Sequence, residues 1–179
     1  MESSGIYITF NVAAADAGTI VVQAFLHGDR ILSSTFPLAE VAACGAKDAP
    51  RMVGCLLLAA LSEGGAALQR YPRLIGMRPP RQFEHATMDA PPTRPAHLRA
   101  RFAIDPDRLL LQRCTRPTAA DATVATLLLA RLALAGPDPA GHALLRALEA
   151  LHPDAFAPFP ALLSAGTLRP CLKRNGANP

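Results

Sequence analysis

Near its start the chain alternates apolar and polar residues with a period of two. The apolar positions are Ile6, Ile8, Phe10 and Val12, and the residues between them are Tyr7, Thr9 and Asn11. This period is typical of a strand with one buried face. Residues 19–26 are apolar on both faces, which predicts a central strand. His27-Gly28-Asp29 predicts a tight hairpin turn, because glycine tolerates positive φ, and residues 30–36 then complete a β-meander.

Helical patterns follow the meander. Pro37 is placed to open a short helix and Gly45 to end it. Asp48 is the predicted N-cap of a longer helix that reaches about Tyr71 and contains Gly64-Gly65, where we expect a break or a close approach of another backbone. Residues 73–77 predict a short strand. The resulting order β-β-β-α-β is similar to the opening of ribonuclease-H-like and actin-like folds.

Prolines dominate the next segment, residues 78–97, which contains few large apolar side chains. We expect a long, flexible surface loop that separates two halves of the chain.

The second half partly restates the first, without the sequence identity that would define a repeat. Residues 98–104 alternate as a strand, Asp105-Pro106-Asp107 is a turn, and residues 109–114 are the returning strand of a second β-hairpin. The apolar segment 118–135 is predicted to be a helix capped by Thr118. It lacks a clean polar face, so it is either a central core helix or a face buried against another subunit.

The C-terminal part is predicted to be helical. A helix beginning at Asp138 carries Leu144, Leu148 and Leu151 on one stripe, residues 153–164 form short helical turns, and a basic tail from about residue 168 frays. Strands followed by helices, twice over, predict an α+β fold. At 179 residues the whole chain fits one compact domain.

The amino-acid composition indicates a folded protein with reduced thiols. Hydrophobic residues make up 50% of the chain and charged residues 18%, which excludes disorder. Alanine, proline and arginine are abundant, as in proteins from GC-rich genomes. The cysteines are Cys44, Cys55, Cys114 and Cys171, without a C-x-x-C pair, so we expect reduced thiols. Neither long apolar segment, 52–68 or 118–135, is free of charge, and no signal-peptide pattern opens the chain, so we expect a cytoplasmic protein without a membrane span.

The sequence contains no complete catalytic motif. Asn11 stands where a ribonuclease-H-like strand would need an acid, so such a domain would be catalytically dead. The segment around Gly45 and Lys47 lacks the second glycine and the hydroxyl of a phosphate loop. No histidine is spaced for a metal site, so no metal or other cofactor is expected. Cys114 lies between Arg113 and Arg116, where cations favour a thiolate, but no histidine is near it in sequence.

The middle of the chain is unusually rich in arginine. Ten arginines lie between residues 70 and 116, against four acidic residues. Arg99 and Arg101 share one strand face, and Arg113 joins them if the hairpin register allows. We expect these three to form an electropositive face for an anionic partner, either nucleic acid or an acidic protein. The alternative is a solvated face in an arginine-rich protein.

These observations favour a non-enzymatic protein-interaction, adaptor or chaperone-like module that forms a homo-oligomer or binds a protein partner. One alternative is a catalytically dead ribonuclease-H-like domain that binds an anionic partner. A rival hypothesis is an enzyme whose site is assembled from distant residues under the 78–97 loop. That site would gather two or more of a set of titratable side chains, namely His27, Asp29, Glu40, His85, His97 and Cys114.

Overall fold

A computed structural model describes residues 5–62, 70–75, 91–103, 107–115 and 122–164. The strands are β1 (Ile6–Val12), β2 (Thr19–Leu26), β3 (Asp29–Pro37), β4 (His97–Phe102), β5 (Arg108–Cys114) and β6 (Ala122–Leu128). The helices are α1 (Leu38–Ala43), α2 (Gly45–Ser62), α3 (Pro72–Ile75), α4 (Leu129–Ala135), α5 (Asp138–Leu151), α6 (Pro153–Phe156) and α7 (Ala161–Ser164).

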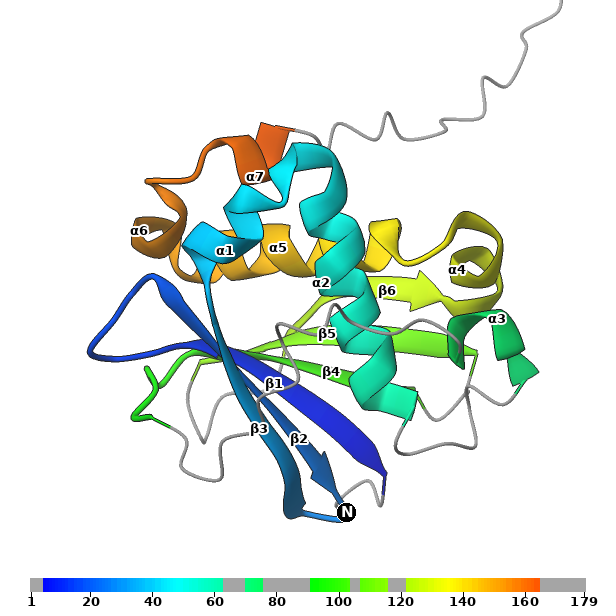
Figure 1. Cartoon of the computed structure of the whole chain (residues 1–179). Helices are drawn as coiled ribbons and strands as arrows, with labels where there is room; N and C mark the ends of the chain where they lie inside the picture. The colour runs from blue at the N-terminus through cyan, green and yellow to red at the C-terminus, as the bar shows by residue number, and fades with distance from the viewer. Residues whose placement is uncertain (1–4, 63–69, 76–90, 104–106, 116–121, 165–179) are drawn as a thin grey trace, which may run out of the picture.

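All six strands form one antiparallel sheet in the order β3-β2-β1-β4-β5-β6. The described helices gather over one face of this sheet, with α2 and α5 crossing above its centre (Figure 1). The predicted α+β class, with an N-terminal meander followed by helices and a second hairpin, is therefore confirmed.

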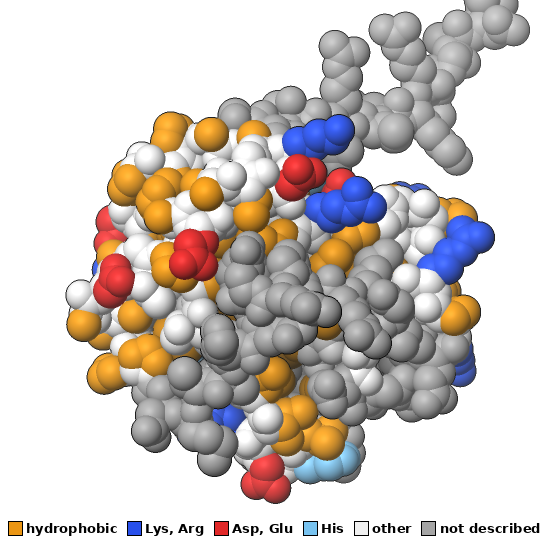
Figure 2. All heavy atoms as spheres, in the orientation of Figure 1, with side chains coloured by type: hydrophobic (Ala, Val, Ile, Leu, Met, Phe, Trp, Pro, Cys, Tyr) orange, Lys and Arg blue, Asp and Glu red, His pale blue; other side chains and the backbone are white. Residues whose placement is uncertain are grey.

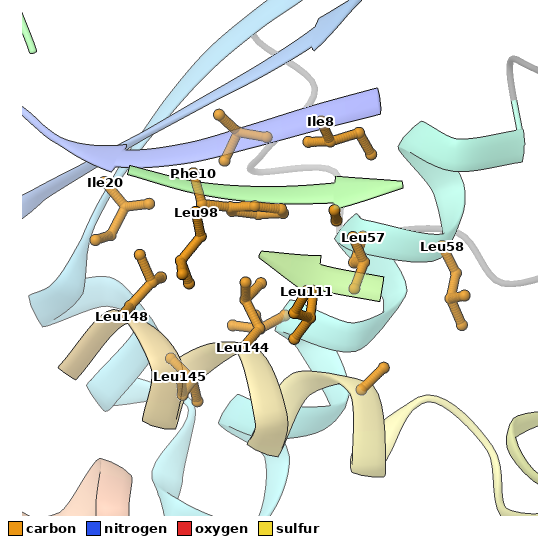
Figure 3. Packing of buried hydrophobic residues seen from close by; sticks show 14 of the residues in the cluster. Ile8, Phe10, Ile20, Leu57, Leu58, Leu98, Leu111, Leu144, Leu145 and Leu148 are labelled. Atoms are coloured by element: carbon orange, nitrogen blue, oxygen red, sulfur yellow. The ribbon is translucent and has the colours of Figure 1, made fainter. Parts of the chain in front are cut away.

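One continuous core fills the space between the sheet and the helices. Phe10 of β1 and Leu98 of β4 point from the centre of the sheet towards Leu144 and Leu148 of α5, and Leu57 of α2 points into the same space (Figure 3). Each of these five side chains is at most 1% exposed. Burying a side chain of this size contributes roughly 1.5–3 kcal/mol, so the predicted stripes of β1 and α5 hold the two layers together.

The β2–β3 hairpin forms as the sequence predicts. Leu26 pairs with Asp29, so His27 and Gly28 alone make the turn. Their φ angles are +52° and +90°. Two consecutive positive φ values define the turn whose twist matches that of the flanking strands.

The two halves of the sheet repeat the same plan about the β1–β4 pair. Each half is a three-stranded meander whose edge strand runs directly into a short helix, α1 or α4, and then into a long helix, α2 or α5. The short helices are each followed by a glycine with nearly the same φ, +87° at Gly45 and +86° at Gly136. The sheet order reads outwards identically from β1 and from β4, so the fold has an internal pseudo-two-fold arrangement.

The long helices touch where each has a glycine. A methyl group on Gly141 would overlap the carbonyl oxygen of Pro50, and a methyl group on Gly54 would overlap that of Pro137. Pro50 lies in α2 and Pro137 caps α5, and each precedes the glycine of its own segment by four residues. The two P-x-x-x-G segments therefore contact each other reciprocally. Close approach of these backbones therefore fixes how α2 and α5 cross.

Two predicted helices have different bounds in the structure. The segment 118–135 is not one helix, since residues 122–128 form strand β6 and only Leu129–Ala135 are helical. Thr123, Val124 and Thr126 are β-branched, and such side chains favour a pleated strand over a helix. The long helix begins at Gly45, before Asp48, so Asp48 lies in its first turn and does not cap it.

The predicted strand at 73–77 is also wrong, because Pro72–Ile75 form helix α3. The next strand along the chain, β4, pairs antiparallel with β1. Pro72–Ile75 therefore do not supply the last strand of the β-β-β-α-β order that suggested similarity to ribonuclease-H-like folds, and the next described strand after the helices is β4. Gly64-Gly65, the proline-rich residues 78–90 and the tail from 168 lie outside the described residues.

Candidate interaction surfaces

The sheet face turned away from the helices carries the arginines Arg99 and Arg101. Their strand neighbours Leu98 and Ala100 are buried in the core, so alternation places both arginines on the opposite face, as predicted. Neither side chain is fully exposed. Each is held by a contact within the sheet.

These contacts run diagonally between strands. The Arg99 guanidinium carbon lies 5.3 Å from the centroid of the Tyr7 ring, and Tyr7 in turn stacks on Phe25, with 4.9 Å between centroids and 11° between planes. Arg101 donates a hydrogen bond of 2.7 Å from Nε to Oε1 of Gln112. The register puts Tyr7 directly opposite Arg101, and Gln112 directly opposite Arg99. Arg99 therefore contacts the residue opposite Arg101, and Arg101 contacts the residue opposite Arg99.

Arg113 does not join this face. It pairs with Leu98, whose side chain is buried on the helix side of the sheet. Directly opposed residues of an antiparallel pair project from the same face. Arg113 therefore projects from the face opposite to that of Arg99 and Arg101, and the three arginines do not share one surface.

The titratable residues of the rival enzyme hypothesis are mostly apart. His27 and Asp29 belong to the β2–β3 hairpin, Glu40 is exposed on α1, and His85 lies outside the described residues. His97 and Cys114 are directly opposite each other on β4 and β5, a pairing that the sequence reasoning missed. Nδ1 of His97 lies 3.3 Å from the carbonyl oxygen of Pro95, and the Cys114 side chain is buried.

His152 is a buried polar residue that the sequence reasoning did not single out. It is 3% exposed, and its Nε2 lies 3.1 Å from the carbonyl oxygen of Ala96. Burial lowers the pKa of the imidazole, and the nearby Arg94 lowers it further. Arg94 also forms an ion pair of 3.0 Å with Asp154. This cluster fastens the segment before β4 to the start of α6.

The described residues hold no group of three or more His, Cys, Asp or Glu side chains suited to a metal ion. Among the described helices, none combines the length and the apolar character needed to cross a membrane.

Exposed aliphatic side chains mark a second surface at one end of the sheet. The large hydrophobic residues with exposed side chains in the described chain are Ile31, Val124, Leu128 and Leu134, at 45%, 45%, 40% and 84%. Val124 and Leu128 belong to edge strand β6, and Leu134 belongs to α4, which directly follows it (Figure 1). We name the outer side of β6 together with Leu134 the β6 surface.

Figure 2 shows orange side chains gathered over α1, α6 and α7 as well. Ala157, Pro158 and Ala161 are exposed in this part of the chain. These are small residues, so they offer less apolar area per side chain than Leu134 does.

The opposite edge of the sheet differs in chemistry. Strand β3 begins with the exposed residues Asp29 and Arg30 and ends with Pro37, whereas β6 contains neither a charged residue nor a proline. Charges and prolines are the usual devices by which proteins block pairing at a sheet edge. Both edges also have a register shift, β3 against β2 at Ile31 and β6 against β5 at Val124, so the difference between the two edges lies in charged residues and proline, which β3 has and β6 lacks.

Comparison with known proteins gives no relative: no family model, no curated protein and no solved structure matches the chain.

Proposed function

We propose that this protein is a non-enzymatic interaction module, acting as an adaptor or chaperone-like subunit that binds protein through the β6 surface. The observation that carries the proposal is Leu134, which is 84% exposed in α4, the helix that directly follows the uncharged edge strand β6. Burying such an exposed aliphatic side chain under a partner contributes about 1.5–3 kcal/mol to the free energy of binding.

The main-chain groups of β6 determine how a bound strand is oriented. Within the described residues, β6 pairs with β5 alone, so its outer side presents the amide and carbonyl groups of a sheet edge. Such an edge binds another strand by main-chain hydrogen bonds, and neighbouring side chains give specificity. Val124 and Leu128 supply apolar contacts along the same strand.

The cytoplasm is the proposed compartment. Cys44 and Cys55 form no disulfide among the described residues, and burial raises the pKa of Cys55, which keeps that thiol protonated and unreactive. Free thiols of this kind persist where the redox poise is reducing.

The test is site-specific photo-crosslinking of the full chain in the cells that make it. A photo-reactive residue replaces Leu134 in one form and Ile31 in the other, because Ile31 is an exposed aliphatic residue on the opposite edge strand. We expect discrete protein adducts at position 134 and none at position 31. Excess unlabelled protein should suppress the adducts, and excess Leu134→Ser protein should not. Equal labelling at both positions, or no adduct at 134, contradicts the proposal.

A further inference from the structure

The partner of the β6 surface follows from the strand itself. The β6 edge is uncharged, whereas the other edge strand, β3, carries charges and a proline. From this difference we infer that β6 pairs antiparallel with β6 of a second copy of this chain, joining two six-stranded sheets across a two-fold axis. This inference rests on the proposed function and names the partner of the same surface.

The pairing of β6 with itself is chemically self-consistent. With the axis at Ala125, the opposed pairs are Ala122 with Leu128, Thr123 with Leu127, Val124 with Thr126, and Ala125 with its own copy. The second copy has to accommodate the bulge that β6 has against β5 at Val124. Every pair is uncharged and contains a β-branched or aliphatic residue or alanine. Like charges, which oppose cross-strand pairing, therefore do not meet along this edge.

The contrast between the two edges selects a closed dimer over an open chain of molecules. A head-to-tail contact would join β6 of one copy to β3 of the next and would propagate without end. The exposed Asp29 and Arg30 and the terminal Pro37 guard β3 against that contact. Two-fold pairing joins β6 of one copy to β6 of the other. Neither copy then has an open β6 edge, so assembly stops at a dimer.

The same arrangement accounts for the exposed aliphatic residues at this end. Val124 and Leu128 lie on the strand that the second copy covers, and Leu134 follows in the helix that continues from it. Their apolar area gives the contact a hydrophobic contribution in addition to its main-chain hydrogen bonds.

The experiment measures the mass of the purified full chain by sedimentation velocity from low to high micromolar concentration. We expect a monomer–dimer equilibrium. Val124→Lys should raise the dimer dissociation constant at least about tenfold, because it sets two ammonium groups as diagonal neighbours across the axis. Ile31→Lys is the matched control, since Ile31 and Val124 are both 45% exposed on edge strands. It should leave the dissociation constant unchanged.

Hydrogen exchange of the same samples locates the contact. Amides of residues 122–128 should gain protection as concentration rises, whereas those of residues 29–37 should not. Thr126→Lys, also at an exposed position, replaces Val124→Lys if the latter loses its native circular dichroism.

The outcomes separate the inference from the proposed function. A strict monomer at high micromolar concentration, or a dimer that Val124→Lys leaves intact, overturns self-pairing. If crosslinking at position 134 then gives adducts with other proteins only, the interaction module stands with a different partner. If position 134 gives no adduct at all, both fail.

Discussion

Gly54 and Gly141 lie against each other where α2 and α5 cross: a methyl group on Gly141 would come within 2.9 Å of the Gly54 amide nitrogen. The same methyl group would lie 2.5 Å from the carbonyl carbon of Pro50, and one on Gly54 would lie 2.8 Å from that of Pro137. These distances involve backbone atoms, which cannot move aside as a flexible side chain can. The two glycines are therefore required by packing between the helices.

Gly141→Ala should destabilise the protein despite the higher helix propensity of alanine. Propensity favours alanine by about 1 kcal/mol in a helix, whereas overpacking a close contact costs about 1–3 kcal/mol and occasionally more. Because backbone atoms are overlapped, we expect a net loss of about 2 kcal/mol in the free energy of unfolding, measured with urea. Gly5→Ala is the control: a methyl group there meets nothing within 4 Å. Equal stability of the two variants would contradict the close helix crossing.

The β2–β3 turn offers a stabilising change. His27 has a φ of +52°, a value that asparagine adopts more readily than histidine, and Asn-Gly is the preferred pair for this turn. We expect His27→Asn to raise the free energy of unfolding by about 0.5 kcal/mol. Gly28→Ala, at φ +90°, should lower it by about 1 kcal/mol. A thermal or urea melt of both variants checks the opposite signs.

Acid should weaken the protein through His152. Burial and Arg94 lower the pKa of this imidazole below its ordinary value of 6.5, outweighing the opposite effects of the Ala96 carbonyl and Asp154. The unfolded chain then binds a proton at a higher pH than the folded chain, so stability is complete above about pH 6.5 and falls as the pH drops through the folded pKa.

We expect His152→Gln to lose less stability than the unchanged protein between pH 7.5 and pH 5.5 in urea melts, because glutamine can still donate to the Ala96 carbonyl and does not titrate. The pKa of His142 is also lowered by burial, but His142 is present in both proteins and cancels from the comparison. Identical pH profiles would show that His152 takes up its proton without cost.

Binding of an anionic partner by Arg99 and Arg101 remains a proposal. Because Arg113 lies on the other face of the sheet, it can serve as the control. Arg99→Ser with Arg101→Ser should reduce retention on a heparin column, and retention should fall steeply with salt if phosphate-like anions bind there. Arg113→Ser, on the other face of the sheet, is the control; because it removes one charge and the double variant removes two, it should change retention by less than half as much. Since Arg99 lies over the Tyr7 ring, we expect the double variant to lose about 0.5–1 kcal/mol of stability as well. Retention lowered equally by all three substitutions would indicate bulk charge alone.

Local patterns predicted much of the fold. Alternation in β1 and the His27-Gly28 turn were sufficient, because each is determined by residues adjacent in sequence. The strand β6 was missed because its neighbours in sequence are apolar, which hid the change from strand to helix at Leu128. The β-branched residues Thr123, Val124 and Thr126 were the available signal, and they conflict with a continuous helix.

The surfaces were harder to predict, since they depend on pairing between distant segments. Arg113 follows the buried Leu109 and Leu111 at intervals of two, so alternation along its own strand already places it on their face of the sheet and not on that of Arg99. The reciprocal P-x-x-x-G segments are visible in the sequence, but their meaning depends on α2 meeting α5. The exposure of Leu134 likewise follows only from where β6 ends and α4 begins.

The pseudo-two-fold plan has a consequence for folding kinetics. Within each half, every strand pairs with its immediate predecessor in sequence, so those hairpins close over short loops. The β1–β4 pair instead joins Thr9 to Arg99, residues 90 positions apart (99 − 9), and among the described strands it is the only pair that crosses between the halves. Closing so long a loop is entropically costly before any contact compensates for it. We therefore expect the meanders to form early and the docking of β4 on β1, together with α5 on α2, to limit the rate. A chain severed between α3 and β4 would keep every other strand pair within a fragment, so its two pieces are suited to reassemble by complementation.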